Sequence, residues 1–249
     1  MIKINKCNPP KVLVDNQASW TKDLLDAVNF YGTYSNIPEA EKKSLISHYR
    51  HKDIQKALFD SSFFKCAFCE CKPATSGYME VDHFAPKSIY PALTFDWDNL
   101  LPACHKCNDA KTDTDTKVNP IIDPSKVDPE ALLTYDSVRI CPTKNTSGVE
   151  LAKATIETCN LNRSQLYHER ANLMVALTEY MDELKDKLEW IEEADTAQKR
   201  KVRLTKLKNS LEKIDAILKS DQPYAGFSRW FVSQYLEFSK AKTMVASMA

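Results

Sequence analysis

The chain has 249 residues, 43% of them hydrophobic and 27% charged, which is typical of a globular protein with one or two domains. Its four glycines are far apart, so neither G-x-G-x-x-G nor G-x-x-x-x-G-K-[ST] occurs, and nucleotide hydrolysis through either phosphate-binding loop is excluded. The 34 basic and 34 acidic residues give a formal net charge of zero, which excludes nucleic-acid binding through overall charge and leaves only a local site.

The first 60 residues are predicted to be mainly helical. Residues 11–14 form a short β-like run, and apolar residues at helical spacing follow in 20–31 and 39–60. Pro38, with acidic residues directly after it, is a typical helix start. We therefore treat 1–60 as an N-terminal helical segment and expect it to contact a partner.

Residues 61–118 are rich in Cys, His, Asp, Asn and Pro and contain only short apolar runs, so a metal-stapled domain that carries the site is expected there. Residues 119–249 are predicted to be a connector, with a strand around 132–140, followed by a C-terminal helical region. Two antiparallel helices with a break near 194–196 are indicated by apolar residues at steps of three or four: Leu173, Leu177, Met181, Leu184, Leu188 and Ile191, then Leu207, Leu211, Ile214 and Leu218.

Two stretches of the C-terminal region have an unusual composition. The basic run Lys199–Lys208 carries six positive charges in ten residues, and it fits either a solvated helix face or a contact to phosphates or an acidic partner. Residues 223–238 are dense in aromatic side chains, which predicts a core segment or a subunit contact.

No apolar run reaches the length of a signal peptide or a membrane span, so a cytoplasmic protein is expected. Cys66 and Cys69 form one C-x-x-C pair and Cys104 and Cys107 another, a donor set typical of a tetrahedral structural zinc site. Cys71 is a second-choice ligand, and a redox dithiol is the competing interpretation. Reduced thiols are expected at the cysteines outside the pairs: Cys7, Cys71, Cys141 and Cys159.

A zinc ion closed by four thiolates has no open coordination position, so the chemistry must come from residues near the two pairs. Asp82 and Asn108 offer the oxygen ligands that Mg²⁺ prefers. His83 has an ordinary pKa close to neutrality and can take a proton from water. Lys87 and Lys111 are candidate phosphate contacts.

The order C-x-x-C, V-D-H-F-x-P-K-S and W-x-N-L-L-P-A-C-x-x-C-N-x-x-K over residues 66–113 resembles the HNH (ββα-metal) endonucleases in their zinc-knuckle form. This resemblance implies an α+β, mainly helical protein, in which a ββα-metal core with a structural zinc site is flanked by N-terminal helices and a C-terminal helical region. It also implies that Asp82 and Asn108 bind the catalytic metal. By the same resemblance His83 is the general base, and Asn99 orients the loop that carries this base.

Asn108 stands where many members of the HNH family have histidine. Asparagine is a known variant in the family and suits Mg²⁺ better than histidine does, with Mn²⁺ as the alternative metal. The implied reaction is hydrolysis of phosphodiester bonds by water that His83 activates.

A broader resemblance covers most of the chain. Residues 1–13 and 155–174 are similar to the HNH subunits of Septu-type anti-phage systems, including retron-associated versions. This resemblance implies a nuclease effector that works with a separate ABC-type ATPase and, in retron versions, with a reverse transcriptase and its RNA–DNA product. DNA is the favoured substrate. The alternatives are cleavage of RNA such as host tRNA, a non-catalytic zinc module that binds nucleic acid or protein, and a helical interaction scaffold.

Overall fold

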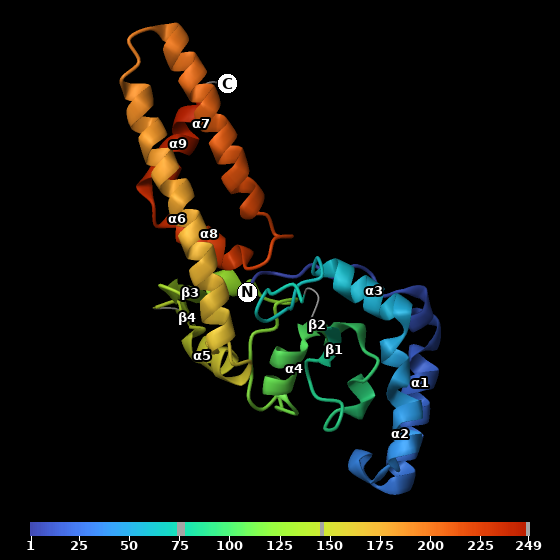
Figure 1. The fold of residues 1–249 in the computed structure, drawn as a ribbon. Coiled ribbons are helices and arrows are strands. Elements are labelled where there is room, and N and C mark those ends of the chain that lie inside the picture. Colours follow the sequence, from blue (N-terminus) through green and yellow to red (C-terminus); the bar gives the residue numbers. More distant parts are fainter. Residues whose placement is uncertain (74–77, 145–146, 248–249) are drawn as a thin grey trace.

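The computed structural model describes residues 1–73, 78–144 and 147–247 (Figure 1). Over these residues the protein is mainly helical with two small antiparallel sheets, which confirms the α+β class. The helices and strands are α1 (Lys11–Tyr31), α2 (Glu39–Ile46), α3 (Lys52–Ser61), β1 (Met79–His83), β2 (Leu100–Cys104), α4 (His105–Lys111), β3 (Leu133–Asp136), β4 (Arg139–Pro142), α5 (Val149–Thr158), α6 (Ser164–Glu192), α7 (Ala197–Ile217), α8 (Ala225–Ser233) and α9 (Leu236–Ala246).

Figure 1 shows three regions along the molecule. The helices α1 to α3 lie on one side, the unit of β1, β2 and α4 lies at the centre, and a long arm built around α6 and α7 projects away on the other side. Within the described ranges, no helix is both long enough and apolar enough to cross a membrane.

The β-like run expected at residues 11–14 is wrong, because these residues form the first turn of α1. Pro10 is extended, and the helix begins directly after it. Leu13 and Leu24 are fully buried on the inner face of α1, whereas Val14 is 61% exposed. A run of three apolar residues, Val12 to Val14, cannot distinguish a strand from a helix, and the packing of one helix face decides between them here. The predicted start of α2 after Pro38 is confirmed.

The central unit places two sets of side chains on opposite faces of one strand. Strands β1 and β2 are antiparallel, every residue of β2 is buried, and α4 follows β2 directly. Because side chains alternate along a strand, Glu80 and Asp82 share one face of β1, and Val81 and His83 share the other. Glu80 and Asp82 contact α4, whereas Val81 packs with the N-terminal helices. The expected ββα core is therefore present.

The C-terminal region follows the predicted pattern with one change. The single strand expected around 132–140 is the hairpin β3–β4, which turns at Ser137, a residue with a φ of 52°. Helices α6 and α7 are the predicted antiparallel pair, separated by residues 193–196. The aromatic segment 223–238 supplies core side chains, among them the buried Phe227 and Phe231.

Hydrophobic packing crosses the boundaries expected at residues 60 and 118. One buried cluster joins Leu24 of α1 with Trp97 of the central region. A second cluster joins both cysteine pairs with Ile122 of the connector, and a third fills the arm. The division into 1–60, 61–118 and 119–249 stays a prediction.

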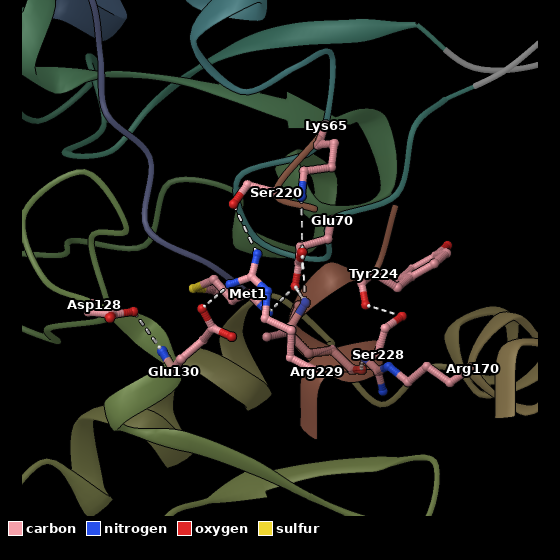
Figure 2. A network of polar contacts seen from close by, with 12 residues as sticks. Met1, Lys65, Glu70, Asp128, Glu130, Arg170, Ser220, Tyr224, Ser228 and Arg229 are labelled. Carbon is pink, nitrogen blue, oxygen red and sulfur yellow. Dashed lines mark hydrogen bonds and ion pairs between the residues drawn. The ribbon is translucent and has the colours of Figure 1, made fainter. Parts of the chain in front are cut away.

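A buried carboxylate next to the first cysteine pair contacts both the first residue of the chain and helix α8 (Figure 2). Glu70 lies 2.7 Å from the α-amino group of Met1 and 3.1 Å from Nζ of Lys65, and the backbone N–H of Gly226 in α8 donates to it at 3.3 Å. A Cβ atom on Gly226 would lie 2.8 Å from Oε1 of Glu70, so this close approach requires glycine. The nearby pair of Arg229 and Glu130 is about one third exposed.

We expect Glu70→Ala to destabilise the protein by about 3–5 kcal/mol, because it leaves the ammonium of Lys65, 3% exposed, buried without its partner. Glu130→Ala is the matched control, since it removes a carboxylate from a half-buried pair in the same network and is expected to cost about 1 kcal/mol or less. Urea unfolding of the zinc-loaded proteins measures both free energies. Equal losses for the two variants would contradict this account.

Candidate active site

An open cavity of about 300 Å³ lies where β1, α4 and the turn between α2 and α3 meet. Most of the residues that the sequence singled out for catalysis or phosphate binding are brought together in its lining. Its charged and polar lining residues include Asp82, His83, Lys87 and Asn108 from this set, together with Arg50 and Glu80.

His83, the last residue of β1, is buried, with 5% of its surface exposed. Its Nε2 lies 3.0 Å from the carbonyl oxygen of Thr94, and the ring of Tyr49 meets it edge-on at 4.7 Å. A carbonyl only accepts, so Nε2 carries the hydrogen and the lone pair of the neutral ring is on Nδ1. Burial lowers the pKa of His83 to about 3, and Lys87 acts in the same direction. The imidazole is therefore neutral at neutral pH.

Asp82 is buried, and its two carboxylate oxygens have different environments. Nζ of Lys111 donates to Oδ1 at 3.1 Å and to the carbonyl oxygen of His83 at 2.8 Å. Oδ2 is also buried, yet it has no hydrogen-bond partner among the residues described. Burial raises the pKa of Asp82, and the charge of Lys111 opposes this shift. A carboxylate oxygen without a hydrogen-bond partner is suited to act as a ligand of a cation.

The phosphate contact expected at Lys111 does not fit its environment. Its side chain is 1% exposed and its ammonium is held by Asp82 and the backbone of His83, so it compensates a buried charge and does not reach solvent. Lys87 does line the cavity, and burial lowers the pKa of its ammonium.

Asn108 and Glu80 face each other across the cavity wall. Nδ2 of Asn108 donates to Oε2 of Glu80 at 2.6 Å, and Oε1 of Glu80 lies 3.0 Å from Nδ1 of His105. Residues 108 and 111 are three apart on α4 and lie on the same helix face, as Glu80 and Asp82 do on β1. The two facing pairs thus form one row of polar contacts between strand and helix.

Asn99 is buried, does not line the cavity, and bridges the loop that follows β1. Its Oδ1 accepts from the backbone N–H of Ala85 at 2.7 Å, and its Nδ2 donates to the carbonyl oxygens of Ala85 and Leu93 at 3.0 Å each. The loop that begins after His83 is therefore held by a buried amide side chain.

Two residues of the N-terminal segment belong to the site and were not predicted. Tyr49 packs against His83, and Arg50 lines the cavity and donates from Nε to the hydroxyl of Tyr49 at 3.0 Å. Both lie more than ten residues before the first cysteine pair, outside any recognised motif. No pattern in the sequence marks them, because only the packing of α1 to α3 on β1 brings them to His83.

The four paired cysteines form one buried cluster outside the cavity lining. Their sulfur atoms all lie within 4.8 Å of one another, and Sγ of Cys69 and Sγ of Cys104 are 3.7 Å apart. Sulfur ligands on a tetrahedral zinc with bonds of about 2.3 Å are separated by about 3.8 Å, so the cluster fits zinc. All four are free thiols, and the second-choice ligand Cys71 lies beside the cluster without being one of the four.

Arg163, the residue before α6, covers this cluster and was also not predicted. Its Nη1 lies 3.4 Å from Sγ of Cys107 and its Nη2 lies 3.6 Å from Sγ of Cys69. Four thiolates around one Zn²⁺ keep a net negative charge, which the guanidinium offsets. The contact also joins the first residue of the arm to the central unit.

The comparisons with known proteins agree with this geometry. Residues 66–114 match the family described as HNH endonuclease. This segment is an HNH endonuclease domain. It contains β1, β2 and α4, both cysteine pairs and the polar row of the cavity, all within the 66–114 match.

Two proteins with the name "Septu protein PtuB" are similar to the chain. The one from Bacillus thuringiensis is 36% identical over 126 residues, which cover 50% of this chain and 42% of that protein. The one from Bacillus mycoides (strain KBAB4) is 26% identical over 207 residues, which cover 70% of this chain and 67% of that protein. The chain therefore matches less than half the length of the first relative.

We expect Arg163→Met to weaken zinc binding about 10- to 100-fold, because residues that contact metal ligands commonly contribute that much to metal affinity. Release of zinc to the chromogenic chelator 4-(2-pyridylazo)resorcinol measures the effect. Arg200→Met, which removes an exposed arginine from α7, is the control and should release zinc at the wild-type rate. The interpretation of Arg163 fails if both variants behave as the wild type.

Proposed function

We propose that this chain is the nuclease effector of a Septu-type anti-phage system. It is a Mg²⁺-dependent HNH endonuclease that hydrolyses phosphodiester bonds, with DNA as the favoured substrate and an ABC-type ATPase as its partner. One observation carries the proposal: the neutral ring of His83 and the carboxylate of Asp82, whose Oδ2 has no hydrogen-bond partner among the described residues, line the same open cavity. The HNH domain and the two PtuB relatives support the class of activity and its role in defence.

The catalytic cation would be held by Oδ2 of Asp82 and Oδ1 of Asn108. Both are hard oxygen donors, and Mg²⁺ is commonly bound in proteins through one or two such ligands plus water and phosphate oxygens. Mn²⁺ is the alternative with the same ligand preference. When bound, the cation supplies charge neutralisation at the phosphate and at the leaving oxygen.

His83 acts as the general base through Nδ1, since Nε2 is engaged with Thr94. Its neutral state provides the lone pair that takes a proton from the attacking water. Asn99 is assigned the role of holding the loop after β1, which its hydrogen bonds to Ala85 and Leu93 support. Tyr49 confines the imidazole from the side.

Two cations on the cavity wall are proposed to bind phosphate. Lys87 keeps this role from the sequence prediction, and Arg50 is added because it lines the same cavity. Both contact Tyr49, whose ring packs on His83: Nζ of Lys87 lies 5.9 Å from the centre of the Tyr49 ring, and Nε of Arg50 donates to the Tyr49 hydroxyl. A phosphodiester entering the cavity would supply the negative charge that these groups face.

The ATPase partner follows from the Septu relatives and from the absence of both glycine-rich phosphate loops in this chain. The reverse transcriptase implied by the retron versions has no support in the relatives found, and we do not include it. We propose that the N-terminal segment 1–60 binds the ATPase, because Phe30 at the end of α1 is 82% exposed.

Nuclease activity should fall about 10²- to 10⁴-fold in His83→Ala, the usual contribution of a general base. The assay compares double-stranded DNA, single-stranded DNA and RNA with Mg²⁺, Mn²⁺ or EDTA, for the protein alone and with the ATPase encoded beside it. His168→Ala, an exposed histidine on α6, is the matched control and should keep wild-type activity.

Each outcome of this assay has a defined meaning. No cleavage of any substrate by the wild-type complex in Mg²⁺ or Mn²⁺, with no difference from His83→Ala, would reject the enzyme and favour the binding module. Cleavage of RNA alone would overturn the assignment of DNA. Cleavage that persists in EDTA would remove the cation from the proposal.

Phe30→Ser should reduce co-purification of the ATPase at least about tenfold, because it removes an exposed apolar contact. Val202→Ser is the matched control, since Val202 is 47% exposed within the basic run of α7. Loss of the ATPase in Val202→Ser but not in Phe30→Ser would move the partner surface from the N-terminal segment to the basic run.

A further inference from the structure

We propose that Glu80 is a positioning residue that fixes the orientation of the Asn108 amide and thereby presents its Oδ1 to the cation. This inference rests on the proposed function, because it concerns the cation at Asp82. Sequence patterns assign no role to Glu80, although it lies two residues before Asp82 on the same face of β1.

The direction of one hydrogen bond determines which end of the Asn108 amide faces Glu80. The two groups are 2.6 Å apart, between Nδ2 of Asn108 and Oε2 of Glu80. An ionised carboxylate only accepts hydrogen bonds, so the NH₂ group of the amide must face Glu80. The carbonyl oxygen is then directed to the other side, where no hydrogen bond to it is found among the described residues.

Glu80 is itself held in place by a second contact. Its second oxygen, Oε1, lies 3.0 Å from Nδ1 of His105 at the start of α4. Both carboxylate oxygens therefore have partners on α4, while Oδ2 of Asp82 has none among the described residues. In this arrangement the carboxylate of Glu80 orients the Asn108 amide, and the carboxylate of Asp82 is left to bind the cation.

An amide is asymmetric, and this makes its orientation matter. If the Asn108 side chain were free to rotate by 180°, its NH₂ group would face the cation for part of the time, and a cation cannot be bound by a group that only donates. Fixing the rotamer removes this loss and the conformational entropy cost of ordering the amide on binding. A carboxylate at position 108 would present an oxygen in either orientation and would need no such partner.

This asymmetry suggests a double-mutant cycle with Mn²⁺ as the probe. Glu80→Met removes the acceptor at nearly constant size, and Asn108→Asp makes residue 108 symmetric. Mn²⁺ binding to the zinc-loaded protein is measured by electron paramagnetic resonance of the free ion, which needs no nuclease activity. Asp82→Ala identifies the site, since binding there must disappear in this variant.

We expect Glu80→Met to weaken Mn²⁺ binding about tenfold in the wild-type background, in line with other residues that orient metal ligands. In the Asn108→Asp background the same change should weaken binding clearly less, because no amide orientation is left to lose and only the attraction of one nearby negative charge is removed. Glu80→Gln, which loses the charge but keeps an acceptor oxygen, should bind within about threefold of the wild type. It thereby separates the hydrogen bond from the local charge.

The outcomes distinguish this inference from the proposed function. If the wild-type protein has no Mn²⁺ site that depends on Asp82, the cation and the proposed function fail together. If that site exists and Glu80→Met leaves it unchanged, or weakens it equally in both backgrounds, the positioning role alone is overturned. Thermal unfolding verifies that each variant is folded, and Glu80→Ala provides the same comparison should the methionine variant unfold.

Discussion

The four thiols of Cys66, Cys69, Cys104 and Cys107 are the constraint on which the central unit depends. Strands of five residues and a helix of seven bury too little surface to be stable by themselves. A metal ion bound by these thiols would join the segment before β1 to the start of α4, so that its binding free energy becomes folding free energy. The thiols lie among buried apolar side chains, which ties this local closure to the wider core.

The rest of the chain is attached at the edges of this metal centre. Arg163, the residue before α6, contacts the sulfur atoms. Glu70, next to the first cysteine pair, binds α8 and the first residue of the chain. Loss of the metal would therefore weaken the attachment of the arm as well as destabilise the central unit. The arm carries its own hydrophobic cluster, so its helices keep separate support.

Electrostatics within the cavity follows from uneven compensation of buried charge. Lys111 neutralises one side of Asp82 from the interior, and this ion pair offsets the free-energy cost of burying the carboxylate away from solvent. The other side is left for a cation that arrives from the cavity. His83 is kept neutral by burial and by the cations near it. The base must be neutral and the cation ligand Asp82 must be charged, and the two side chains lie on opposite faces of β1, so each has its own surroundings.

Local spacing was sufficient to predict the cysteine pairs and the long helices of the arm, whereas the roles expected of Asp82, His83, Asn99 and Asn108 came from the resemblance to HNH endonucleases. The pairs and the helices depend on residues that are near in sequence or on a periodicity that extends over several turns. Only the tertiary structure decided that Lys111 is buried under Asp82, that Arg50 enters the cavity, and that Arg163 covers the thiols. The tertiary structure also decided that residues 11–14 form the first turn of α1. In each case the decisive contact joins segments distant in sequence, and a lysine or arginine has the same side chain whether it meets solvent, a phosphate or a buried carboxylate.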